Sequence, residues 1–175
     1  FIFGETNIDI PKNKEKNIFI EKIFLNTKVN ANPEAIKEIK KADYIIVGPG
    51  DLYTSIVPNF LVTGIKEAFQ KSKAKKIYIC NLVTKFSETN GFTAIDFLKT
   101  LEKYICKKCF DYMVINDFQK IPKRLINVYK KEKKLPVKFN KREFQNNKKM
   151  NIVIDDLTRK NMLLRHDQKK LGEAI

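Results

Sequence analysis

The sequence predicts an α/β protein with a Rossmann-like, three-layer fold and a mostly parallel sheet. The first observation is that short strand-like runs alternate with helix-like segments along the 175 residues. The second is that runs such as 43–47 and 75–82 are almost continuously apolar, which is typical of parallel strands covered on both faces. Right-handed crossovers between such strands then give a Rossmann-like sheet.

Each element is predicted from its local pattern. An Ile-rich run predicts a first strand over 18–25. Pro33 stands at a helix-start position, with apolar residues at helical spacing after it, and predicts a helix over 32–42. Asn59 is a good N-cap and predicts a helix that opens there and runs to 73. The other predicted elements are strands at 43–47, 75–82, 110–116, 136–139 and 151–157 and helices at 94–108, 122–133 and 167–175.

Composition narrows the class of protein. A hydrophobic content of 43% with 13 Phe indicates a globular chain, and no apolar run approaches the ~20 residues of a membrane span. Three cysteines do not suit a disulfide scaffold, so we expect a cytoplasmic location. The chain begins at Phe1 with no visible export signal, and we expect that its start is cut.

The net charge of +15 is typical of proteins that bind nucleic acid. We discount that partner, because only four of the 35 basic residues are Arg, the side chain best suited to phosphate and guanine. The segment 120–149 is the most basic part of the chain. We favour a solvated surface there, with a rim that attracts a phosphorylated ligand as the alternative.

Polar loops follow the predicted strands at the edge where ligands of open parallel sheets bind. The first is "GPGDLYTS" (48–55), whose glycines allow close backbone approach and whose hydroxyls can bind phosphate oxygens. The second is "NLVTKFSETNGF" (81–92), and the third is "NDFQKIP" (116–122). Turn formation alone is the simpler explanation for one such loop. Two long polar loops at equivalent strand ends favour a ligand cleft.

Three stretches carry a family resemblance: "ADYIIVGPGDLYTSIVPNFLVTGIKEAF", "KIYICNLVTKFSETNGFTAIDFL" and "LLRHDQKKLGEAI". They resemble the YvcK family, within the wider CofD-like superfamily, and the similarity covers essentially the whole chain. The resemblance implies one CofD-like α/β domain over 1–175 that lacks the family's N-terminal glycine-rich phosphate loop. The second loop departs from the family's usual pattern at Lys85, Phe86, Ser87 and Asn90, and matches it at Glu88, Thr89 and Gly91.

The resemblance also assigns candidate ligand-binding residues: Gly48, Gly50, Thr54 and Ser55 on the phosphate or sugar side, Asn81, Thr84, Glu88 and Thr89 on a second wall, Tyr129 against the base and Arg165 on a diphosphate. Asp51 is expected to hold a ribose hydroxyl or a metal, or else to cap a turn. For Tyr129 the alternative is core packing, and for Arg165 it is a surface salt bridge with Asp167 or with the terminal helix.

Two functions follow from the resemblance. The first is a regulatory protein that binds a UDP-sugar and is linked to carbon metabolism and cell-wall or cell-shape control. The second is a transferase of the 2-phospho-L-lactate type, which would need a divalent metal or a base. The sequence indicates no certain cofactor and no catalytic residue, and it leaves protein partners and a homo-oligomer open.

Three further groups of Cys, His and Asp residues do not predict a metal-binding or catalytic site. Cys106 and Cys109 form a C-x-x-C pair without an evident set of four zinc ligands, so we read the pair as incidental. His166 has no Ser or Cys partner in a recognisable triad. Asp155 and Asp156 are adjacent and cannot both face one site from a strand.

Overall fold

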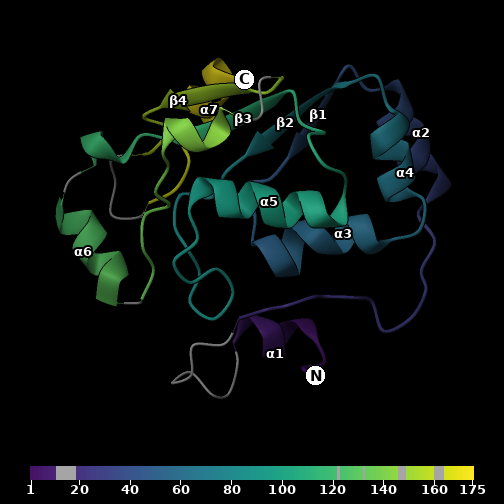
Figure 1. Cartoon of the computed structure of the whole chain (residues 1–175), viewed down its shortest axis with the longest axis horizontal. Coiled ribbons are helices and arrows are strands. Elements are labelled where there is room, and N and C mark those ends of the chain that lie inside the picture. Colours follow the sequence, from purple (N-terminus) through teal and green to yellow (C-terminus); the bar gives the residue numbers. More distant parts are fainter. Residues whose placement is uncertain (11–18, 122, 132, 146–148, 160–163) are drawn as a thin grey trace.

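The computed structural model describes residues 1–10, 19–121, 123–131, 133–145, 149–159 and 164–175 (Figure 1). In chain order the elements are α1 (Glu5–Asp9), α2 (Pro33–Lys41), β1 (Tyr44–Val47), η1 (Leu52–Ile56), α3 (Val57–Leu61), α4 (Ile65–Lys71), β2 (Lys75–Ile79), α5 (Ala94–Tyr104), β3 (Tyr112–Asn116), η2 (Phe118–Lys120), α6 (Lys123–Lys131), η3 (Lys141–Phe144), β4 (Asn151–Asp155) and α7 (Gln168–Ala174). None of these helices is long and apolar enough to cross a bilayer.

The four strands form one parallel sheet in the order β1-β2-β3-β4. β1 and β2 are in register with Val47 opposite Tyr78, and β3 and β4 are in register with Asn116 opposite Asp155. Because every pairing is parallel, all four strands end at the same edge of the sheet. The predicted α/β class with a parallel sheet is confirmed.

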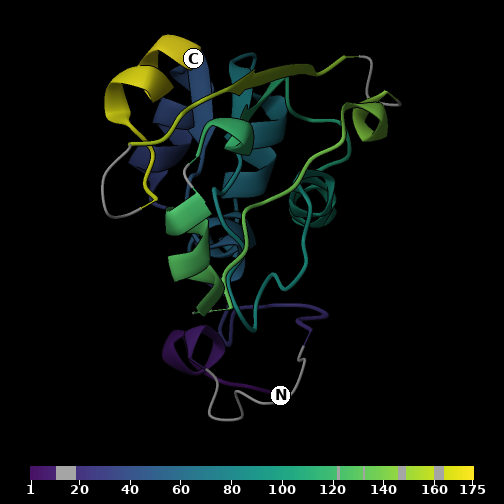
Figure 2. The same ribbon diagram turned by 90° about the vertical axis from the view of Figure 1, so that its left-hand side faces the viewer.

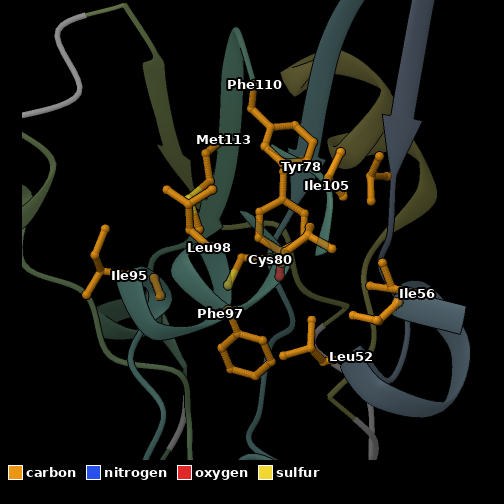
Figure 3. Close-up of a cluster of buried hydrophobic side chains, with 14 of the residues drawn as sticks. Leu52, Ile56, Tyr78, Cys80, Ile95, Phe97, Leu98, Ile105, Phe110 and Met113 are labelled. Carbon is orange, nitrogen blue, oxygen red and sulfur yellow. The ribbon is translucent and has the colours of Figure 1, made fainter. Parts of the chain in front are cut away.

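Helices cover both faces of the sheet, which gives three layers (Figures 1 and 2). On one face, Phe97 and Leu98 of α5 pack in one cluster with Tyr78 of β2 and Met113 of β3. In Figure 3 the ring of Phe97 points toward Leu52 of the same cluster. Full burial of such side chains contributes about 1.5–3 kcal/mol each. On the other face, Leu171 of α7 packs against a smaller cluster of Ile77, Ile79, Val114 and Leu157.

Two of the predicted strands are wrong. Residues 19–25 form no strand, and Ile18 lies outside the described residues. Phe19 and Phe24 are largely exposed, and the backbone N–H of Ile23 donates to the Tyr104 hydroxyl at 2.9 Å instead of to a neighbouring strand. An apolar run becomes a strand only where another strand lies beside it, and the described residues place none along this segment.

The run 136–139 also forms no strand, only an isolated antiparallel bridge between Pro136 and Val83. Thr84 donates its backbone N–H to the Leu135 carbonyl at 2.7 Å, and Val137 donates to the Leu82 carbonyl at 3.0 Å. The segment therefore pairs with the polar loop after β2 and stays outside the parallel sheet.

The single helix predicted from Asn59 to 73 is two helices, and Asn59 is not its N-cap. Asn59 lies inside α3, and its Nδ2 donates to the Ser55 carbonyl at 2.6 Å. Gly64, with a φ of 99°, separates α3 from α4, because its left-handed backbone cannot continue a helix. The Asn32 cap of α2 is confirmed, since its side chain accepts the Glu34 N–H at 2.9 Å.

We expect Gly48→Ala to destabilise the protein more than Gly91→Ala. Both glycines have positive φ, 84° and 70°, which costs an alanine about 1 kcal/mol. A Cβ at Gly48 would also lie 2.8 Å from the Ile79 carbonyl oxygen, whereas a Cβ at Gly91 would meet nothing within 4 Å. In urea unfolding, the free energy of unfolding should fall by about 2–3 kcal/mol for Gly48→Ala and by about 1 kcal/mol for Gly91→Ala. Equal losses would contradict the close approach of β1 and β2.

Candidate functional site

The first polar loop leaves β1 at Gly48 and enters η1, a single π-helical turn. Leu52 and Ile56 of this turn are buried in the same core cluster as β2 and α5 (Figure 3). Thr54 is half-buried and Ser55 is exposed, so the turn presents hydroxyl groups outward while its apolar side chains hold it in place. Short π-helical turns occur frequently at functional sites.

Asn81, directly after β2, joins the second loop to the first. Its Nδ2 donates to the Gly50 carbonyl at 2.8 Å. Its Oδ1 is buried and has no hydrogen-bond partner among the described residues. The two polar loops thus lie side by side at the carboxyl edge, as the sequence predicts, and an acceptor group stands at their junction.

Lys85 forms ion pairs with carboxylates of both loops and of α1. Its Nζ lies 2.6 Å from Asp51 Oδ2 and 2.9 Å from Glu88 Oε1, and it also contacts Asp9 of α1. The Glu88 side chain is fully buried, and desolvation raises the pKa of its carboxyl group while Lys85 opposes that rise. Desolvation raises the pKa of Asp51 as well. The lysine therefore stabilises negative charge on the fully buried Glu88 and on the partly exposed Asp51 and Asp9.

Two of the predicted site residues serve the second loop itself. The Thr84 hydroxyl accepts the Leu135 N–H at 3.0 Å, and Thr84 is only 2% exposed. The Thr89 hydroxyl accepts the Lys85 N–H at 2.9 Å. Thr84 thus holds the segment at Leu135 against the second loop, Thr89 bonds within that loop, and ligand contact by either stays a prediction.

Tyr129 and Arg165 lie on a third surface, next to the second loop. The backbone N–H of Leu164 donates to the Tyr129 hydroxyl at 2.9 Å, which places Tyr129 close to the residue before Arg165. Tyr129, Leu164 and Val83 belong to one apolar cluster, so this surface packs against the second loop. Arg165 is exposed, and among the described residues Asp167 pairs with Arg159 at 3.9 Å instead.

The residues set aside in the sequence form no catalytic group in the described part of the chain. Desolvation lowers the pKa of His166 to about 4, and its Nε2 is buried without a partner there. Cys106 and Cys109 are free, half-buried thiols beyond the end of α5. Asp156 is tied to Lys170 at 3.0 Å, while Asp155 is exposed at the end of β4.

Sequence reasoning missed Asp9 and treated Lys85 only as a departure from a family pattern. Asp9, Asp51 and Glu88 each offer a carboxylate oxygen within 4.8 Å of the others, and among the described residues only these three form such a group. The spacing of Lys85 and Glu88, three residues apart in a turn, was a usable signal. No sequence signal pointed to Asp9, because its contact is with Lys85, which is far away in the sequence.

Comparison with known proteins gives a consistent family. The family model described as "2-phospho-L-lactate transferase CofD" matches residues 1–158. The "Gluconeogenesis factor" of Bacillus subtilis is 39% identical over 89% of the chain, and that of Halalkalibacterium halodurans is 36% identical over 99%. A crystal structure from Bacillus halodurans, described as a member of the UPF0052 family, is 34% identical, with a TM-score of 0.87 over 98% of the chain and 53% of that structure. The chain spans about half the length of these relatives, 49% and 52% of the two curated proteins.

We expect the single histidine to titrate far below neutral pH. Burial disfavours the imidazolium, so His166 should titrate at about 4 in the folded protein, against about 6.5 when unfolded. Below pH 6.5 the unfolded chain binds a proton that the folded chain does not, so the free energy of unfolding should fall by up to about 3 kcal/mol toward pH 4.

NMR gives this value directly, because the chain has only one His and its ring resonance needs no assignment. A resonance that titrates near pH 6.5 would show an exposed ring and contradict the burial of the His166 side chain.

Proposed function

Since the chain belongs to the CofD family, we propose that it binds a nucleotide sugar, with a UDP-sugar as the expected ligand, and acts as a regulatory protein linked to carbon metabolism and to cell-wall and cell-shape control. The link to carbon metabolism is supported by relatives named gluconeogenesis factor. Cytoplasmic location, protein partners and self-association belong to the same proposal.

The observation that carries the proposal is the junction of the two polar loops at Asn81 and Gly50. A nucleotide sugar needs donors for its phosphates and polar groups for its sugar hydroxyls, close together at one edge of a sheet. Gly48 and Gly50 allow a close backbone approach, and Thr54 and Ser55 supply hydroxyls beside them. The Asn81 Oδ1 atom supplies an acceptor that the described protein leaves unused.

Tyr129 and Arg165 would hold the nucleotide from the neighbouring surface. A tyrosine ring can stack on a base, and the hydroxyl contact with Leu164 fixes its orientation. A guanidinium gives two parallel hydrogen bonds to a diphosphate, and Arg165 is exposed and therefore accessible. The basic segment around α6 would add attraction for an anionic ligand without specifying it.

A second candidate is a transferase that joins a nucleotide-activated phosphoacid to an alcohol. The observation in its favour is the description of the family whose model matches residues 1–158. Such chemistry needs a metal or a base at the phosphoryl centre, and Asp51 keeps that option open. Product formed from a deazaflavin and activated phospholactate would favour the enzyme, and saturable UDP-sugar binding without turnover would favour the regulatory protein.

We predict that Arg165→Ala weakens UDP-sugar binding by about thirtyfold, which corresponds to the loss of about 2 kcal/mol from a charge-assisted hydrogen bond. Arg165→Lys should recover little, because an ammonium cannot replace the planar fork. The measurement is calorimetric titration of the intact protein with UDP-glucose and UDP-N-acetylglucosamine.

The control is Lys41→Ala, which removes an exposed cation at the end of α2, outside the basic segment, and should leave the affinity unchanged. Circular dichroism must show that each variant is folded. A folded Arg165→Ala protein that binds as tightly as the parent would remove Arg165 from the site, and absence of binding by the parent would end the proposal.

A further inference from the structure

Cys106 and Cys109 stand at the two ends of one tight turn between α5 and β3. The turn spans 106–109, and Lys107 and Lys108 are its exposed central residues. Lys108 has a left-handed backbone with a φ of 55°. The first and fourth residues of such a turn have Cα atoms less than about 7 Å apart. A disulfide needs Cα atoms about 4.4–6.8 Å apart, so the turn suits a bond between its two cysteines.

The two thiols lie close together, as their backbones do. Burial raises the pKa of the Cys109 thiol, and the neighbouring Cys106 thiol raises it further. Both side chains are half-buried and pack against the same core cluster. The third cysteine, Cys80, is 1% exposed and follows β2 at the opposite edge of the sheet, so it is out of reach of this pair.

The backbone on either side of the turn is held in place. Gln70 Nε2 donates to the Ile105 carbonyl at 2.6 Å, and the backbone N–H of Lys108 donates to Glu102 Oε1 at 2.7 Å. Ile105 and Phe110, which flank the two cysteines, are buried in the core cluster (Figure 3). Groups held close together react as if present at a very high concentration, so a bond within this pair is favoured over a bond to a free thiol.

We infer that Cys106 and Cys109 form a redox-active dithiol, which a low-molecular-weight disulfide such as oxidised glutathione converts to an intramolecular disulfide. The Cys106 thiolate attacks the small disulfide, which gives a mixed disulfide and releases one small thiol. Cys109 then attacks the Cys106 sulfur, closes the internal bond and releases the second small thiol. The protein dithiol loses two electrons and two protons, and the small disulfide gains them. Cys106 attacks first because burial keeps the Cys109 thiol protonated.

The internal bond would tie the end of α5 to the start of β3. It closes a short loop and restricts the unfolded chain, so the oxidised protein should unfold at a temperature about 4–8 °C higher than the reduced protein. The pair precedes β3 and therefore lies at the amino edge of the parallel sheet, away from the two polar loops. The inference does not depend on the nucleotide-sugar proposal.

The test is equilibration of the intact protein with oxidised and reduced glutathione, followed by alkylation of the remaining thiols, digestion and mass spectrometry. Trypsin cleaves after Lys107 and Lys108, so the oxidised turn should appear as two peptides joined by one bond. The parent should retain no glutathione, and Cys80 should stay reduced. Thermal unfolding of the oxidised and reduced forms gives the shift in midpoint.

Two matched variants separate the roles of the thiols. Cys109→Ser should keep one glutathione on Cys106, because no second thiol is left to displace it. Cys106→Ser leaves the thiol that burial keeps protonated, and it should gain glutathione at least about tenfold more slowly than Cys109→Ser does. Circular dichroism must show that both variants are folded.

Several results would overturn the inference. They are a parent that keeps both thiols in excess oxidised glutathione, a parent that gains glutathione without joined peptides, a bond that includes Cys80, and a lower unfolding midpoint after oxidation. Equal rates for the two variants would also contradict it. If either variant fails to fold, the joined peptides and the midpoint of the parent still decide. None of these outcomes bears on UDP-sugar binding, which is measured separately.

Discussion

β1 and β2 pair in parallel with Val47 opposite Tyr78, and the positions of the two polar loops depend on that pairing. Parallel strands end at the same edge, so the segments that follow them must emerge together. Gly48 makes the close approach feasible, because a Cβ there would lie 2.8 Å from the Ile79 carbonyl oxygen. The Asn81–Gly50 hydrogen bond then fixes the two loops to each other within two or three residues of the sheet.

Charge supplies the second constraint on the loops. A fully buried carboxylate such as Glu88 is tolerated only if a positive group lies next to it, and Lys85 is that group. Since Lys85 also contacts Asp51 and Asp9, one ammonium connects α1 to both loops. A single positive charge therefore holds together segments whose backbone has little regular structure of its own.

The central part of the fold could be predicted from the sequence. The runs that became β1 to β4 are apolar and bounded by polar residues, and Pro33 after Asn32 marked the start of α2 correctly. The run 19–25 has the same apolar character but no strand beside it in the described residues, and a single sequence does not report such neighbours. Asn59 is a residue type that often caps helices, yet the chain becomes helical seven residues earlier, at Leu52, because the buried Leu52 and Ile56 hold the π-helical turn against the core.

The candidate site was predictable in outline only. Turn-forming glycines and hydroxyls after buried strands predicted which loops meet, but not that Thr84 would bond to Leu135 and Thr89 to Lys85. The Lys85 cluster depends on a contact between residues 9 and 85, which no local pattern encodes.

The central claim is that one ligand engages both loops at the carboxyl edge. Hydrogen–deuterium exchange of the intact protein, with and without saturating UDP-sugar, tests it most directly. The account predicts slower exchange with ligand in peptides that cover 48–61 and in those that cover 81–92, with no change in α2. Protection of only one loop, or protection confined to segments away from both, would contradict it.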